Sequence, residues 1–148
     1  MQFAAALQYL RRSGLINQLG IELELDGEAL RCAMVIDAQH CGAPGIAHGG
    51  AVATLLDTAL GARAMQHSMA RGRATSTVEI KVNFLRPARV GQTLITQTRI
   101  ESAGRSLLVV SGSARDAETD EPVAFAVGTF NLYVSETMKR PRAADDDA

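Results

Sequence analysis

Six segments of the chain have the hydrophobic pattern of β-strands. In most of them apolar and polar residues alternate with a period of two, which is typical of a strand that buries one face. The connections after residue 84 are short, and Asp26-Gly27 forms a tight turn between the first two strands, so we expect antiparallel hairpins. The predicted strands are 19–25, 30–36, 77–84, 93–101, 106–115 and 123–134.

A different pattern occupies residues 46–64, where apolar residues leave almost no polar face. This composition predicts a helix that the rest of the protein surrounds. Asp57 is the one carboxylate in the segment, and an ionised carboxylate is costly in apolar surroundings unless partners compensate it. Asp57 is therefore a candidate for chemistry. In an alternative interpretation it is the N-cap of a helix that begins at Thr58.

The predicted helix begins at His48-Gly49-Gly50. Backbone N–H groups in the first turn of a helix lack partners within the helix, and residues without side chains leave them accessible. Such a helix start is a ready site for an oxyanion. His48 is either a titrating base or a residue that fixes the loop by bonding to the backbone, and the adjacent glycines favour the second role.

Small residues on the last strand suggest how the sheet and the helix meet. One face of the strand 123–134 consists of Ala124, Ala126 and Gly128, which would let the sheet approach an Ala-rich helix closely. With two strands before the helix and four after it, the economical arrangement is an α+β fold. In it a single antiparallel sheet of about six strands wraps around one long central helix.

The length of 148 residues and a hydrophobic content of 47% suit one domain with a sizeable core. We divide the chain into an N-terminal helical segment at 1–18, whose short amphipathic helix is stopped by Ser13-Gly14, and a domain at 19–135. A flexible charged tail is predicted at 136–148.

The charge balance argues against two classes of partner. Fifteen Lys and Arg against sixteen Asp and Glu give a net charge of -1, so nothing favours nucleic acid or an anionic membrane. With neither a signal peptide nor a membrane span recognisable, we expect a cytoplasmic protein. Cys32 lies on the apolar side of its strand and predicts a buried thiol, whereas Cys41 in a loop has no assigned role.

Taken together, the motifs resemble those of PaaI-type acyl-CoA thioesterases of the hotdog fold. The resemblance rests on His48-Gly49-Gly50, on Asp57 nine residues after the histidine, and on the downstream strand that ends in Phe84-Leu85-Arg86-Pro87 with Gly91 after it. It covers roughly residues 19–133.

The resemblance implies a site and a mechanism. In the similar enzymes the first glycine donates its N–H to the thioester oxygen, the helical carboxylate attacks or activates water, and a Ser or Thr on the following strand positions that water. These roles map to Gly49, Asp57 and Thr77, with His48 beside them. The resemblance implies no metal or redox cofactor. It also implies a homodimer or homotetramer in which Gly49 and Asp57 of one site come from different chains.

The substrate-binding residues are less sharply predicted. Gly42 and Gly50 belong to the loop and the helix start, and Arg86 and Arg105 are candidates for contacts with CoA phosphates. Many similar enzymes carry Asn or Gln six residues before the histidine, where this chain has Gly42. Either Gly49 acts alone on the oxyanion, or His40 or Gln39 replaces the missing side chain, or activity is low. The other arginines in or near loops are Arg71, Arg73 and Arg89.

Rival functions follow from the same residues. A non-catalytic acyl-CoA binding or sensing protein is one, and a hotdog dehydratase or hydratase is another. A zinc site is disfavoured because Cys41, His40 and His48 lack paired ligand spacing. Ser111-Gly112-Ser113 is not a nucleophile elbow, and the loop 42–50 matches no dinucleotide-binding motif.

Overall fold

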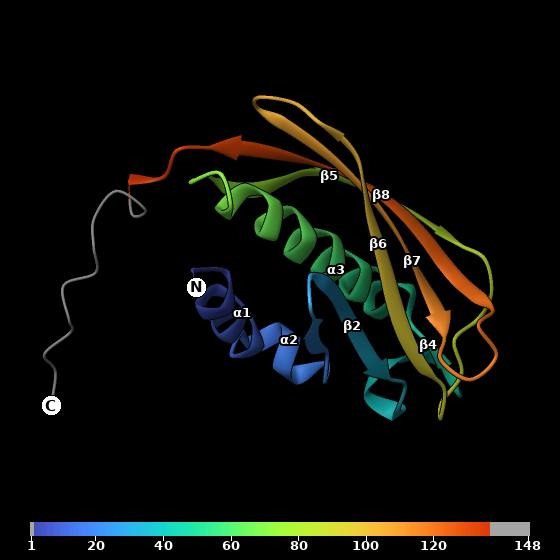
Figure 1. Ribbon diagram of the computed structural model, residues 1–148. Helices are drawn as coiled ribbons and strands as arrows, with labels where there is room; N and C mark the ends of the chain where they lie inside the picture. Colours follow the sequence, from blue (N-terminus) through green and yellow to red (C-terminus); the bar gives the residue numbers. More distant parts are fainter. Residues whose placement is uncertain (1, 137–148) are drawn as a thin grey trace, which may run out of the picture.

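A computed structural model describes residues 2–136, and the predicted charged tail lies outside them apart from Glu136. Its six-stranded antiparallel sheet has the order β1-β2-β6-β7-β8-β5 and curves around the long helix α3 (Figure 1), which confirms the predicted α+β fold. The strands are β1 (Glu22–Asp26), β2 (Ala29–Val35), β5 (Ala74–Phe84), β6 (Thr93–Ala103), β7 (Leu107–Asp116) and β8 (Pro122–Tyr133). The helices are α1 (Gln2–Arg11), α2 (Gly14–Gln18) and α3 (Gly49–Met69).

Small residues on the sheet let α3 pack closely against it, as predicted. Ala124 and Ala126 are fully buried, and a Cβ added at Gly128 would lie 3.2 Å from Leu60 Cδ2. On the neighbouring strand, a Cβ at Gly112 would lie 2.8 Å from Leu60 Cδ1. Leu60 therefore fills space that side chains on β7 and β8 would otherwise occupy.

The helical regions differ from the predicted ones at three places. Helix α3 continues beyond Ala64, where the predicted helical segment ends, as far as Met69, and Ser68 in this extension is fully buried. A second short helix, α2, begins at Gly14, where the sequence predicted only a stop. Between β2 and α3, a 3-10 turn at Ala38–His40 precedes two short paired strands, β3 (Cys41–Ala43) and β4 (Ile46–Ala47).

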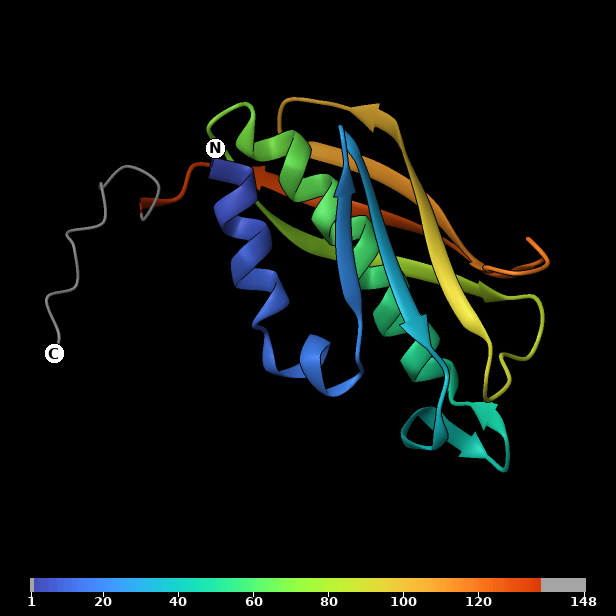
Figure 2. The same cartoon turned by 60° about the horizontal axis from the view of Figure 1, so that its bottom comes forward.

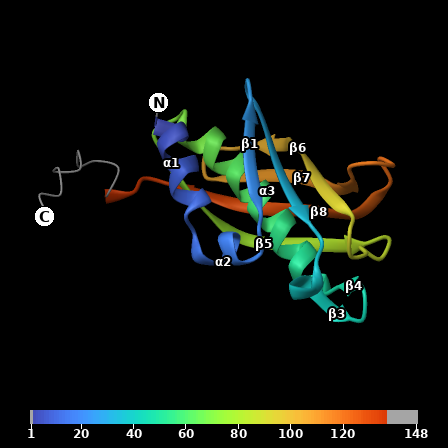
Figure 3. The same ribbon diagram turned by 90° about the horizontal axis from the view of Figure 1, so that it is seen from below.

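These short strands mark one end of the molecule. Figure 3 shows β3 and β4 projecting where α3 begins, and Figure 2 shows α1 running alongside α3 near the β1–β2 hairpin. Cys32 on that hairpin is fully buried, which confirms the predicted thiol environment, and burial raises its pKa to about 12. Among the described helices, none is long and apolar enough to cross a membrane.

Strand β5 contains an irregularity that its sequence pattern does not reveal. The pairing with β8 shifts between Thr77 and Glu79, so that Val78 is an extra, bulged residue and is 59% exposed. Strict alternation predicts Val78 on the same face as Ile80 and Thr77 on the same face as Glu79, and the bulge changes both relations, although Thr77 is exposed as expected. Thr77 pairs with the buried Phe130 and shares its face, because one extra residue reverses the phase of a strand.

Candidate active site

The start of α3 leaves one backbone donor free. His48 is the N-cap, and its Nδ1 accepts a hydrogen bond of 2.8 Å from the N–H of Gly50. The N–H of Ala51 donates to the backbone oxygen of His48 at 2.9 Å. Within the described structure the N–H of Gly49 has no hydrogen-bond partner, so it is the group in this turn that can receive an oxyanion.

The capping bond also decides between the two roles considered for His48. Its Nδ1 is committed to the Gly50 N–H, which fixes the loop to the helix. The backbone N–H of His48 donates to the oxygen of His40 at 2.7 Å and adds a second tie between loop and helix. The structure therefore supports the loop-fixing role for His48, and Gly50 serves the cap.

The imidazole ring of His48 also explains why residue 42 is a glycine. A Cβ at Gly42 would lie 2.8 Å from Cδ2 and 3.1 Å from Cβ of His48, closer than such atoms normally approach. A residue with a side chain, such as the Asn or Gln of similar enzymes, therefore does not fit here unless His48 moves. The glycine at position 42, where similar enzymes have Asn or Gln, therefore leaves the space that the capping ring of His48 occupies.

His40, considered above as a replacement donor, is not available for that role. Its side chain is buried, with 2% of the residue exposed. Nδ1 accepts from the N–H of Asp37 at 3.0 Å, and Nε2 donates to the backbone oxygen of Leu19 at 2.7 Å. Both ring nitrogens are engaged, so this alternative is wrong. The Gln39 side chain points to the Asp37 carboxylate, with its Nε2 donating at 3.4 Å.

Gly42→Ala tests this loop. We expect a loss of about 1 kcal/mol in the free energy of unfolding, because the methyl group displaces the capping ring. Thermal unfolding and thiol release from acyl-CoA should both decline relative to wild type. Gly14→Ala is the matched control, because a Cβ there meets nothing within 4 Å. Equal stability and activity of the Gly42 variant and the control would contradict this explanation.

Asp57 lies two turns further along α3 and is next to β5, the strand at one edge of the sheet. It is inside the helix, so its interpretation as an N-cap is wrong. It lines a cavity of about 330 Å³. The other lining residues are Leu10, Ser13, Leu15, Ile16, Thr54, Thr58, Gly61, Ala62, Met65, Thr75, Ser76, Thr77 and Phe130.

The surroundings of Asp57 are less closed than the sequence predicted, because its side chain is exposed at the cavity in the single chain. Desolvation by the apolar lining nevertheless raises the pKa of Asp57, and a hydrogen bond from Thr77 lowers it by a smaller amount. In that bond the Thr77 hydroxyl donates to Oδ1 of Asp57 at 3.4 Å. The bulge at Val78 is what brings Thr77 to this face.

The raised pKa of Asp57 has a consequence for stability. Because the folded state disfavours the ionised carboxylate, the protein is stabilised below the usual aspartate pKa and loses that contribution as pH rises through the raised value. Asp57→Asn carries no charge and avoids the loss. We expect its unfolding temperature to exceed that of wild type at about pH 7 and to match it at about pH 3. An identical difference at both pH values in thermal unfolding would refute the assignment.

Gly49 and Asp57 do not meet within one chain. Eight residues of helix separate them by about 12 Å along the axis, and they line different cavities. Gly49 opens on a cavity of about 340 Å³ beside Phe84 and Arg86, where a Cβ at Gly49 would lie 3.2 Å from Phe84 Cζ. The Nη1 of Arg86 donates to the backbone oxygen of Pro122 at 2.8 Å.

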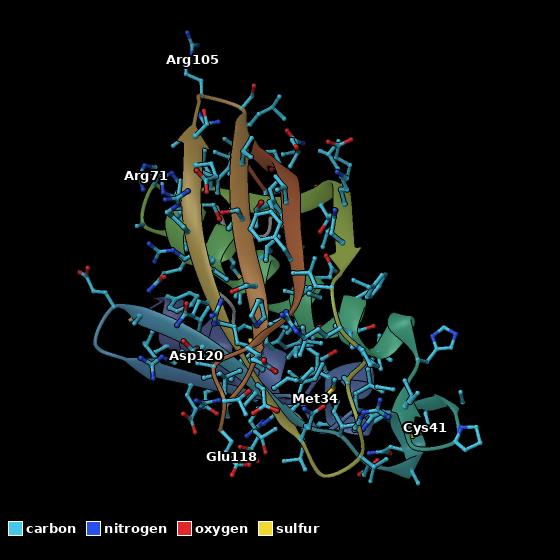
Figure 4. All side chains as sticks on the ribbon, turned by 90° about the vertical axis from the view of Figure 1, so that its right-hand side faces the viewer. Met34, Cys41, Arg71, Arg105, Glu118 and Asp120 are labelled. Carbon is cyan, nitrogen blue, oxygen red and sulfur yellow. The ribbon has the colours of Figure 1, made fainter. Side chains whose placement is uncertain are left out.

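The structure separates Arg105 from this group. Figure 4 shows Cys41 at one end of the molecule, where α3 begins, and Arg105 at the opposite end. The backbone oxygen of Arg105 accepts from Nη1 of Arg73 at 3.1 Å. Within one chain, Arg86 is thus beside Gly49 while Arg105 is not.

Several residues of the site were not identified from the sequence. The wall of the Asp57 cavity includes Leu15 and Ile16 from the N-terminal helices, and Met65 and Phe130 come from α3 and β8. Only the amphipathic pattern near the N-terminus hinted that this segment packs on the domain. The described residues contain no cluster of three or more His, Cys, Asp or Glu placed to hold a metal ion.

Comparisons with known proteins identify the family and the fold. The family model of the thioesterase superfamily matches residues 44–123 of this sequence. A Pseudomonas aeruginosa protein with the provisional name of esterase is 37% identical over 100 residues, which are 68% of this chain and 72% of that protein. Acyl-coenzyme A thioesterase 13 of Mus musculus is 28% identical over 105 residues, covering 71% and 74% of the two chains. The structure of the E. coli PaaI protein from the phenylacetic acid degradation operon has a TM-score of 0.76. The structural match covers 88% of this chain and 90% of the PaaI chain, at 24% sequence identity. It shows a shared fold.

Proposed function

The chain belongs to the thioesterase superfamily, and from that premise we propose that it hydrolyses acyl-CoA thioesters to a free carboxylic acid and CoA. The predicted family resemblance is confirmed, and membership supports thioesterase activity in general. The finer proposal rests on two features of one helix: a carboxylate with a raised pKa lines a cavity, and the first N–H of the helix has no hydrogen-bond partner within the described residues.

In the proposed reaction, the Gly49 N–H stabilises the oxyanion that forms when the thioester carbonyl is attacked. A carboxylate with a raised pKa is a stronger base than one in water, and Asp57 has that property. As a general base it takes a proton from water, the water oxygen bonds to the carbonyl carbon, the C–S bond breaks, and the thiolate is protonated. As a nucleophile its carboxylate oxygen bonds to the carbonyl carbon, the C–S bond breaks, and the thiolate leaves and is protonated. Water then hydrolyses the resulting anhydride to the acid product and the Asp57 carboxylate. Thr77 orients the Asp57 carboxylate in both routes.

Isotope labelling can identify the anhydride route. If Asp57 forms the anhydride and water attacks its carboxyl carbon, a single turnover in H₂¹⁸O places the label in Asp57 itself. Label in the acid product alone results from the base route or from water that attacks the anhydride at the acyl carbon. Mass spectrometry of the product and of the peptide that contains Asp57 locates the label.

The separation of about 12 Å between Gly49 and Asp57 supports a site that combines two chains. Strand β5 is at the end of the strand order, so its outer edge is available for pairing. A second copy that pairs there would bring its own α3 toward this one, and the Asp57 cavity beside this edge would become part of a shared site.

Gly49→Pro provides a precise test of this arrangement. Gly49 is the first helical residue, where proline is tolerated, and His48 before it is already extended at φ -61 and ψ 139. The substitution removes the N–H, whereas Gly49→Ala keeps it and serves as the control for contact with Phe84. Mixing the Gly49→Pro and Asp57→Asn proteins should restore about a quarter of wild-type activity if subunits exchange at random in a dimer. No recovery in demonstrated heterodimers would contradict the shared site.

The function itself is tested by thiol release from a panel of acyl-CoAs with short, medium, long and aryl acyl groups. Saturable hydrolysis of one class supports the enzyme, and the apolar lining around Met65 and Phe130 favours an acyl group in the Asp57 cavity. Tight binding of an acyl-CoA without turnover on any substrate would overturn the proposal in favour of a binding or sensing protein.

A further inference from the structure

The sheet is open between β2 and β6 for part of its length. These strands pair only at Ala33–Val35 with Thr93–Ile95. Continuing the same register would place Arg31 opposite Gln97, but no such pair forms. Figure 4 shows the β1–β2 hairpin turning away from β6 toward its tip. At the point where the strands part, the N–H of Cys32 donates to the Thr96 hydroxyl at 2.9 Å instead of to a backbone oxygen.

A cavity of about 390 Å³ occupies this opening. Its walls are Ala29–Arg31 on one side and Thr96–Thr98 on the other, and the continued register would have paired Leu30 with Thr98 and Arg31 with Gln97. We call it the β2–β6 pocket. Backbone groups on the facing edges of two parted strands need hydrogen-bond partners from water or from a ligand. The walls also carry the hydroxyl of Thr98 and the amide of Gln97.

Arg63 of α3 reaches the β2–β6 pocket from the helix. Its Nη1 donates to Oε1 of Gln66 at 2.5 Å, while its Nε is buried and has no hydrogen-bond partner within the described residues. An arginine on a helix this rich in buried apolar residues needs compensation for its charge and its donors. The amide oxygen of Gln66 accepts one hydrogen bond from Arg63 and therefore supplies only part of that compensation.

A second guanidinium lines the same pocket. Arg31 of β2 is exposed there, and within the described residues neither Arg31 nor Arg63 forms an ion pair with a carboxylate. Glu28 also lines the pocket, but its recorded contact is through its backbone oxygen, which accepts from Nε2 of Gln66 at 3.1 Å. The pocket thus combines two arginines, one glutamate, neutral polar side chains and a buried N–H that has no partner within the described residues.

The β2–β6 pocket is separate from the candidate active site. Arg63 follows Asp57 by six residues, which places it about 240° around the helix. The Asp57 cavity lies against β5 and the N-terminal helices, whereas the β2–β6 pocket lies between two strands on the other side of α3.

We propose that the β2–β6 pocket binds a small organic anion through a carboxylate or phosphate group, with Arg63 and Arg31 as its charged contacts. The planar guanidinium presents paired N–H groups that match either oxyanion in a bidentate manner. The Nε–H of Arg63 belongs to such a pair, and Thr98, whose side chain is on the helix-facing side of β6, supplies a further polar contact. This proposal concerns binding, so it stands independently of the hydrolase activity.

Isothermal titration with inorganic pyrophosphate and with hexanoate, at constant physiological ionic strength, tests the site and distinguishes the two oxyanions. We expect saturable binding of at least one probe to wild type. Arg63→Gln and Arg31→Gln should each lower the affinity for that probe roughly tenfold or more, since each removes one guanidinium group. Arg63→Lys keeps the positive charge but lacks the paired N–H groups of the guanidinium. Its affinity for the probe should lie between those of Arg63→Gln and wild type.

Arg99→Gln is the matched control for charge. Arg99 is on the same strand as Thr98, but it pairs with Glu101 at 2.8 Å and does not line the pocket. Absence of saturable binding to wild type, or an equal loss in the Arg99 variant, would overturn the proposal. Because Arg31 is exposed, its variant tests the site even if Arg63→Gln fails to fold.

Discussion

Asp57→Asn should lower kcat for thioester hydrolysis by about 10²- to 10⁴-fold, the range typical of losing a general acid–base group. The amide has nearly the same shape, so the cavity and the helix should be preserved. What it lacks is the capacity to take a proton from water or to form an anhydride. Thiol release with the preferred acyl-CoA from the panel gives kcat and KM separately, and KM should change little because the acyl group contacts the apolar walls.

Glu118→Gln is the matched control for this prediction. It makes the same carboxylate-to-amide change in the turn after β7, remote from α3, and should leave kcat within twofold of wild type. Retention of more than a tenth of wild-type kcat by Asp57→Asn would show that the carboxylate is not the reacting group. If the variant instead fails to bind acyl-CoA, the residue has a binding role and the proposed mechanism is wrong.

The position of Asp57 could be predicted from sequence because it depends on local periodicity. A run of apolar residues after His48-Gly49-Gly50 specifies a helix, and nine residues of spacing then fix the place of the carboxylate along it. The same logic located the close contact at Gly128, since small residues on a strand have few other uses. Local rules of this kind need no knowledge of distant partners.

The placement of Thr77 shows where local rules stop. Perfect alternation over the strand predicts one face for Thr77 and Glu79, yet a single bulged residue reverses the phase between them. A bulge is set by how β5 pairs with β8, and nothing within the strand records it. The relation between Gly42 and His48 is likewise tertiary, because the ring that excludes a side chain comes from six residues later.

The core offers the largest expected effect on stability. Leu60→Ala should lower the free energy of unfolding by about 2 to 5 kcal/mol, and we expect the upper part of that range. Leu60 is fully buried, and the strand positions that face it are Gly112 and Gly128. Collapse around a truncated residue requires neighbouring side chains to move inward, and glycines have none to offer. The cavity should therefore persist, which is the condition under which such substitutions cost most.

Leu25→Ala is the control with the same chemical change, since Leu25 on β1 is 39% exposed. Urea unfolding should show a loss of less than about 1 kcal/mol for it. A Leu60 variant no less stable than this control would mean that the sheet can close onto α3 despite the missing side chain. Because α3 carries both Gly49 and Asp57, such closure would also shift the helix against the sheet, and thiol release would report it. Stability and activity of Leu60→Ala together therefore indicate whether close packing at Gly112 and Gly128 holds the helix in the position that the chemistry requires.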